Sequence, residues 1–207
     1  AATSGLAGDA LGRFAHDCNA KGPCRIGAPS LFGQAPSWGA YAESMRKPCT
    51  RFFTGLYAAS HNPAVYYQEL ADCGLHAQNL SALGRDLDAD TLPAFVFVTP
   101  NMCHSMHNCS VATGDAWLRR VIGRLTASAT YQRGDTAIFV TFDESDKGNG
   151  DSRVVTIVVS PSTAPGTRAG AHFDHYALLR TTEEMLGLDA FLGRAARAPS
   201  LRAAFNL

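Results

Sequence analysis

One uncharged stretch of the sequence constrains the fold more than any other. Residues 136–142 are mostly β-branched or aromatic and carry no charge. Such a run predicts a strand buried on both faces, in the middle of an α/β sheet. Two carboxylates, Asp143 and Glu144, stand where the strand should end, and a polar loop follows as far as Asp151. Because α/β sheets bind ligands at the carboxyl ends of their strands, this acidic pair is a candidate for holding a cation or moving a proton. The alternative is that it begins a solvated turn.

Two further apolar runs, residues 94–99 and 153–160, predict strands that each stop at a proline. Between the first run and the 136–142 strand, an amphipathic helix is expected to open at residues 114–115. Its apolar side chains recur at helical spacing, at Trp117, Leu118, Val121, Ile122 and Leu125. The connection is long enough for a parallel crossover, so we expect both strands to end at the same edge of the sheet.

Histidines lie in the loops that follow these strands. His104 and His107 precede the amphipathic helix, and His175 opens a helix expected over residues 175–186. We therefore expect His107, Asp143, Glu144 and His175 to share one edge of the sheet. Carboxylates and imidazoles are ligands for divalent cations, and a cation beside an imidazole and a helix N-terminus suits a phosphate ester. His104 alone is more simply an ordinary loop residue. Structural or surface positions are assigned to His16, His61 and His76.

Six cysteines fall into three neighbouring pairs, Cys18 with Cys24, Cys49 with Cys73, and Cys103 with Cys109. None lies in a close metal-binding pair, and the sequence cannot by itself prove one connectivity. An even count at short spacings favours disulfides and an exported protein. The alternative is six buried thiols in a cytosolic enzyme.

Composition and charge exclude several classes of protein. The 207 residues are 46% hydrophobic, enough for one core, so we expect a single domain over residues 1–207. Eighteen basic residues balance eighteen acidic ones, which argues against a nucleic-acid partner. No apolar run is long enough for a transmembrane segment. The sequence begins without Met and shows no signal peptide, so we expect that an N-terminal segment has been removed or left out.

Several short motifs follow one another in an order typical of one family. They lie at residues 98–101, 106–109, 114–118, 141–144, 159–161 and 175–183, with weaker matches at 38–45 and 61–64. In this order they resemble the phosphoesterase family that includes bacterial acid phosphatases and phospholipases C, within the alkaline phosphatase superfamily. The resemblance implies an α/β fold with a mainly parallel central sheet and helices on both faces. It also implies hydrolysis of a phosphate ester, with Asp143 and Glu144 at a metal site, His107 at the phosphoryl group, and His175 at the same catalytic edge.

Two departures from the family pattern concern the site. An Asn-Asp pair usually stands where this chain has His104 and Ser105, and an Asp where it has Asn108. Fewer carboxylates mean less negative charge for a cation, so the identity of the divalent metal cation stays open.

A third departure concerns the front of the chain. The family's first strand ends in a metal-binding Glu-Asn pair, and a Ser or Thr nucleophile precedes a stretch that resembles Thr3-Ser4-Gly5. The N-terminal strand, the Glu-Asn pair and the nucleophile would then all precede Ala1, which makes Thr3 and Ser4 poor nucleophile candidates. Three interpretations follow: a piece of an enzyme whose separate N-terminal fragment is supplied by another chain, which we favour; a trimmed relative that binds without catalysis; or a protein that uses another nucleophile.

The complete protein is accordingly expected to be a secreted or cell-envelope, metal-assisted phosphoesterase. The alternative is a non-catalytic exported binding protein that keeps a phosphate or metal site, and a sulfatase or phosphonate-cleaving relative is a third class. The sequence does not choose among phosphomonoester, diester and phospholipid substrates, because the pocket walls come from loops that it does not place.

Overall fold

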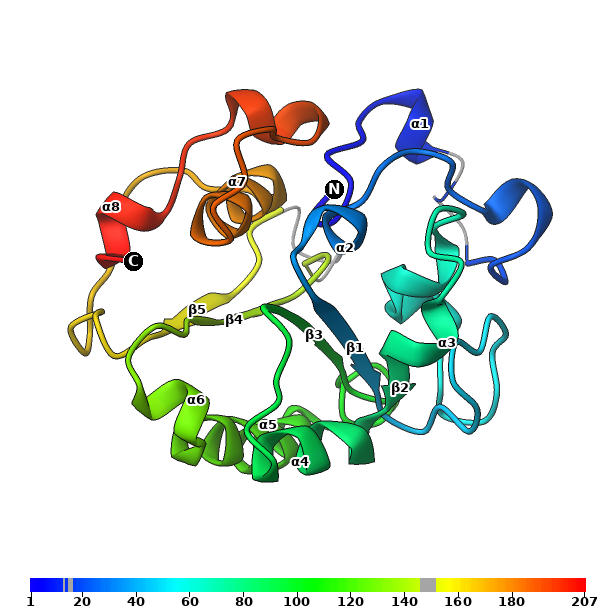
Figure 1. Cartoon of the computed structure of the whole chain (residues 1–207), viewed down its shortest axis with the longest axis horizontal. Coiled ribbons are helices and arrows are strands. Elements are labelled where there is room, and N and C mark those ends of the chain that lie inside the picture. Colours follow the sequence, from blue (N-terminus) through cyan, green and yellow to red (C-terminus); the bar gives the residue numbers. More distant parts are fainter. Residues whose placement is uncertain (13, 15–16, 146–151) are drawn as a thin grey trace.

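Three parallel strands form the larger of two sheets. The computed structural model describes residues 1–12, 14, 17–145 and 152–207 (Figure 1). Strands β1 (Trp38–Ala42), β2 (Ala77–Asn79) and β3 (Phe95–Thr99) run in the order β2-β1-β3, with Trp38 level with Phe95 and Ala42 level with Thr99. The α/β fold class is thereby confirmed. His16 and the end of the polar loop, residues 146–151, lie outside the described residues.

The second sheet is a two-stranded antiparallel pair, which corrects two expectations. Strands β4 (Ile138–Thr141) and β5 (Thr156–Val159) pair with each other, and no ladder joins β4 to β3 within the described residues. The predicted parallel crossover therefore does not bring its two strands together. The second correction concerns burial. The strand at residues 136–142 was expected to be buried on both faces, but all four β4 residues are only partly buried, and Ile157 of β5 is 47% exposed. The pairing is antiparallel, so β5 runs back along β4.

Helices cover both faces of the larger sheet, as Figure 1 shows. On one face, Leu83 and Leu87 of α4 (Leu80–Asp88) pack with Val96 and Val98 of β3. On the other, Phe95 packs against Leu31 of α2 (Leu31–Gln34) and Leu179 of α7 (His175–Met185). The remaining helices are α1 (Asp9–Gly12), α3 (Cys73–His76), α5 (Val111–Ala127), α6 (Ala129–Gln132) and α8 (Arg202–Phe205), with 3₁₀ turns at Gly22–Cys24, Ala59–His61, Pro63–Tyr66 and Gly193–Arg197.

Element boundaries follow local capping chemistry. The Ser110 side chain accepts a hydrogen bond from the Thr113 N–H, so α5 begins three residues before the Gly-Asp pair expected to open it. Asp174 accepts hydrogen bonds from the N–H groups of Tyr176 and Ala177, and α7 starts at His175 as predicted.

No helix in the described parts of the chain combines the length and apolar character needed to cross a bilayer.

All three predicted disulfides are present: Cys18–Cys24, Cys49–Cys73 and Cys103–Cys109. Cys49–Cys73 spans 24 residues and ties the segment after β1 to the start of α3. Each of the other two joins cysteines that lie six positions apart in the sequence.

Buried polar side chains of α7 hold the C-terminal segment in place. Glu183 is fully buried, and its Oε1 accepts a 2.8 Å hydrogen bond from the Leu192 N–H. Thr181 Oγ1 likewise accepts from the Leu201 N–H at 2.8 Å. Glu183 Oε2 has no hydrogen-bond partner among the described residues. An ionised carboxylate is unfavourable in such surroundings, and burial raises the pKa of Glu183 above its ordinary value of 4.5, against the opposing hydrogen bond from Leu192.

The buried Glu183 carboxyl makes the stability of the protein depend on pH. A raised native pKa means that the folded state binds more protons than the unfolded state, so this contribution is present at low pH and lost as pH rises above about 4.5. Glu183→Gln cannot ionise, and its unfolding free energy should fall less than that of the wild type as pH rises through that window. Urea unfolding of both proteins across this range measures the difference. A wild-type curve parallel to that of the variant would contradict the assignment.

Candidate functional site

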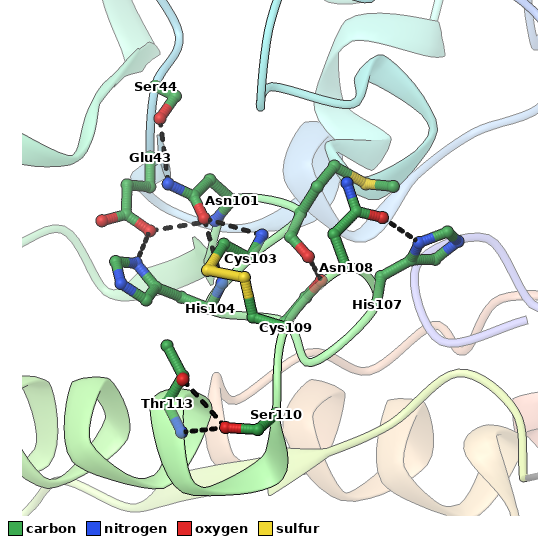
Figure 2. Close-up of a disulfide and its surroundings, with 12 residues drawn as sticks. Glu43, Ser44, Asn101, Cys103, His104, His107, Asn108, Cys109, Ser110 and Thr113 are labelled. Carbon is green, nitrogen blue, oxygen red and sulfur yellow. Dashed lines mark hydrogen bonds and ion pairs between the residues drawn. A yellow bond between two sulfur atoms is a disulfide. The ribbon is translucent and has the colours of Figure 1, made fainter.

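The loops that follow β1 and β3 form a hydrogen-bonded cluster at the carboxyl edge of the parallel sheet (Figure 2). Asn101 lies at its centre and is buried. Its Oδ1 accepts from the N–H groups of Cys103 and His104, both at 3.0 Å, and its Nδ2 donates to Ser44 Oγ at 3.1 Å. The Asn101 N–H donates to Glu43 Oε2 at 3.0 Å. One amide therefore joins the ends of two neighbouring strands.

His104 is fixed by the same carboxylate. Its Nδ1 lies 2.8 Å from Glu43 Oε2, and its ring stacks on Trp117 of α5 with centroids 5.9 Å apart. The His104 and Glu43 side chains are 25% and 20% exposed. These two contacts orient the ring. The interpretation of His104 as an ordinary loop residue overlooked this partner.

Covalent and steric constraints hold this loop against α5. The Cys103–Cys109 disulfide closes it, and Met106 adopts a left-handed φ of 68°. A Cβ on Gly114 would lie 2.5 Å from the Met106 side chain, so only glycine permits this approach. The disulfide and this close approach hold the loop against α5.

His107 lies on the outer part of the same loop. Its Nδ1 is 2.8 Å from Asn108 Oδ1, and its ring centroid is 6.4 Å from that of His61. Thr99 Oγ1 donates to the His61 carbonyl at 2.9 Å, which ties His61 to the end of β3. His61 therefore lies near the candidate site, although it was assigned a structural or surface position from the sequence.

The second predicted group joins the loop after β4 to the start of α7. His175 Nε2 lies 3.0 Å from the Asp143 carbonyl oxygen, so the ring donates from this nitrogen. Asp143 and Glu144 are exposed. The structure thus brings His175 and Asp143 together across 32 residues of sequence. Convergence of this pair with His107 stays a prediction.

The residues at this edge match a divalent cation in kind but not in number. Carboxylate oxygens suit a hard divalent cation in kind. In number they fall short, because no group of three or more His, Cys, Asp or Glu side chains able to hold a metal occurs among the described residues. Asp143 and Glu144 alone do not complete such a site.

Thr3 and Ser4 are built into the core. Both are buried, Thr3 Oγ1 lies 2.7 Å from the Tyr67 hydroxyl, and Ser4 Oγ accepts from the Leu6 N–H. These contacts leave neither hydroxyl placed to attack a substrate, in agreement with the sequence argument.

Comparison with known proteins shows the family to which this chain belongs. A model described as "Phosphoesterase family" matches residues 15–189. The chain belongs to the Phosphoesterase family. It is 27% identical over 172 residues to a phosphate-repressible acid phosphatase of Penicillium chrysogenum, covering 76% of this chain and 41% of the relative. A phosphatidylinositol-3-phosphatase of Mycobacterium tuberculosis is 31% identical over 147 residues, covering 71% and 47%. An acid phosphatase of Aspergillus fumigatus is 27% identical over 172 residues, covering 76% and 38%.

The chain therefore spans less than half the length of each of these relatives. Within the Phosphoesterase match, His107, Asp143, Glu144 and His175 stay predicted site residues. From the sequence, Glu43 and Asn101 were named only as members of the motifs at residues 38–45 and 98–101 and were given no role. The signal for both was present, because each is a polar residue placed just after an apolar strand, as Asp143 is.

Glu43 should make a measurable contribution to the stability of this edge. Glu43→Ala removes the acceptor for both the Asn101 N–H and His104, and should lower the unfolding free energy by about 2 kcal/mol. Glu43→Gln keeps one acceptor oxygen and should lose less than half of that. Urea denaturation of the two variants beside wild type measures the ranking. If the unfolding free energy of Glu43→Ala lay within about 0.5 kcal/mol of wild type, the hydrogen bonds of Glu43 would not contribute to stability.

Proposed function

We propose that this chain is part of a secreted or cell-envelope hydrolase that cleaves phosphate esters. The observation that carries the proposal is the hydrogen bond from His175 to the Asp143 carbonyl in a Phosphoesterase family chain. It brings two motif loops together at the N-terminus of an 11-residue helix. Helix N-termini favour anions, and an imidazole beside one is suited to a phosphoryl group.

Each proposed site residue has a defined task. His107 and His175 bind phosphoryl oxygens or move the proton between the nucleophile, the leaving alcohol and water. A Ser or Thr outside residues 1–207 attacks phosphorus, the ester oxygen leaves with a proton, and water then releases phosphate.

Asp143 and Glu144 would supply two carboxylates to a divalent cation whose other ligands would come from outside residues 1–207. When bound, such a cation would offset the charge of the phosphoryl group and lower the pKa of the attacking hydroxyl. The partial ligand set favours a metal site shared between residues 1–207 and the rest of the polypeptide, because this chain contributes some of the ligands and not all of them.

Export is supported by the disulfides. Three bridges and no free cysteine in the described chain are typical of proteins that fold in an oxidising compartment. The competing function is a non-catalytic exported protein that binds phosphate, which the shortfall in metal ligands would favour.

Hydrolysis of p-nitrophenyl phosphate tests the proposal directly. The natural polypeptide containing residues 1–207 is assayed from acidic to alkaline pH, with chelator and with several added divalent metals. We expect turnover that chelation abolishes and metal restores. Calorimetry with inorganic phosphate and vanadate runs in parallel. Binding without turnover under every condition would support the binding protein instead, and neither binding nor turnover would refute both.

A further inference from the structure

Three large apolar side chains are exposed on one short loop, residues 51–57, which we call the apolar loop. Phe52, Phe53 and Leu56 are 51%, 40% and 44% exposed. Apolar residues scattered singly over a surface are ordinary, whereas a group of them marks a surface that meets another molecule. The loop belongs to the segment that leaves the end of β1 and runs along the outside of the molecule (Figure 1).

The backbone of the apolar loop is held in place although its side chains are exposed. Thr54 and Tyr57 exchange two backbone hydrogen bonds of 3.0 Å, and Gly55 between them adopts a left-handed φ of 59°. Tyr57 is buried and anchors the end of the loop in the core. The Phe53 N–H donates to Asn19 Oδ1 at 3.1 Å. The fold therefore presents these apolar side chains to solvent on a fixed backbone.

The charge around the apolar loop has one sign. Residues 44–68 contain Arg46, Lys47 and Arg51 but no Asp or Glu, in a chain whose formal net charge is zero. Within the described chain, none of these three cations takes part in a salt bridge. The segment 17–21 donates a backbone hydrogen bond to the Arg51 carbonyl at 2.9 Å and adds one acid and one base. The positive charge therefore remains unbalanced and favours a negatively charged partner.

The apolar loop is joined to the loop of the candidate site. The Leu56 carbonyl accepts a hydrogen bond of 2.9 Å from the Met102 N–H. Met102 directly follows Asn101, whose side chain lies at the centre of the cluster after β1 and β3. A partner bound at the apolar loop would therefore lie beside the candidate site.

We propose that the apolar loop inserts into the surface of an anionic phospholipid bilayer, with the three cations of residues 46–51 at the lipid headgroups. Phenylalanine and leucine side chains enter the boundary between headgroups and acyl chains, while Lys and Arg are attracted to anionic headgroups. Three side chains are too few for a stable protein interface, which buries about 800 Å² on each partner. The proposal rests on exposure and charge and does not depend on the proposed hydrolysis.

Co-sedimentation of the natural polypeptide containing residues 1–207 with phospholipid vesicles tests this insertion. Vesicles of phosphatidylcholine mixed with phosphatidylserine should bind it, and vesicles of phosphatidylcholine alone should bind it far more weakly. High salt should weaken the binding. Absence of binding by the wild type, or equal binding to both kinds of vesicle, would overturn the proposal.

Variants assign the binding to this loop. Replacing Phe52, Phe53 and Leu56 together by alanine should lower the partition coefficient roughly 100-fold or more. Arg46→Gln combined with Lys47→Gln should lower it roughly fivefold for each charge removed. Val155→Ala is the control, because Val155 is 61% exposed elsewhere on the molecule, and it should bind as the wild type does. Unchanged binding by the triple variant would contradict insertion through this loop.

The competing occupant of the apolar loop is polypeptide from outside residues 1–207. A Phe53→Trp variant of the natural polypeptide distinguishes the two, measured as the difference in emission from wild type. The added indole should emit as an exposed group in buffer and shift to shorter wavelength on anionic vesicles. Short-wavelength emission already in buffer would show that protein covers the loop and would overturn the proposal.

The triple alanine variant also separates membrane binding from hydrolysis. It should hydrolyse soluble p-nitrophenyl phosphate at the wild-type rate, because none of its three changed side chains belongs to the candidate site. Its denaturation midpoint should stay close to wild type, because all three side chains are exposed. Vesicle binding is measured without turnover, so a failed insertion and a failed activity are distinguishable.

Discussion

Replacing Phe32 by alanine should lower the unfolding free energy by about 3–5 kcal/mol, the range for deleting a buried aromatic ring. Phe32 is 1% exposed, and its ring meets those of Trp38 and Phe95 at 5.2 Å, Phe97 at 6.0 Å and Tyr67 at 6.1 Å. It lies on α2, a helix of one turn that cannot move inward alone, because Ser30 caps it and also donates to Glu69. The surrounding rings should therefore leave a cavity rather than close over it.

Chemical denaturation of the Phe32→Ala protein measures this loss. Phe52→Ala makes the same chemical change at a ring that is 51% exposed, and should cost no more than about 1 kcal/mol. Similar losses in the two variants would mean that Phe32 does not hold α2 to the sheet. A change in the slope of the denaturation curve would point to an altered unfolded or native state instead.

Replacing His175 by alanine in the natural polypeptide should lower kcat/KM for p-nitrophenyl phosphate roughly 100-fold or more, the usual contribution of a positioned acid–base group. This expectation rests on the proposed function. The imidazole is held at the Asp143 carbonyl, and truncation removes both that contact and the group proposed to meet the phosphate. His107→Ala should produce a loss of similar size if the two residues act at one site.

His172→Ala is the matched control, since His172 is exposed in the loop that leads to the same helix. It should leave kcat/KM within about twofold. Asp174 still caps α7 in all three variants, so circular dichroism and denaturation midpoints should stay close to wild type. Full activity in the His175 variant would remove this residue from the proposed mechanism, while unfolding would assign it a structural role.

Local chemistry explains which elements could be predicted. The apolar runs at β3, β4 and β5 and the start of α7 at His175 are encoded in neighbouring residues, as are the close cysteine spacings. By contrast, β2 has only three residues, Ala77–Asn79, with no pattern of its own, and it forms because β1 provides a partner. Helical spacing from Leu179 and Thr182 predicts that Met185 faces inward, yet it is 36% exposed.

The amino-acid sequence by itself determined strands β3, β4 and β5, the start of α7, and the placing of acids and imidazoles directly after strands, since all of these depend on residues close together along the chain. Only the tertiary structure decided which of those residues meet. Glu43 reaches His104 across 61 residues, and His175 reaches Asp143 across 32. The tertiary structure also decided that β3 and β4 do not pair. Strand pairing depends on which backbone edges meet in space, and the sequence of one strand does not identify its partner.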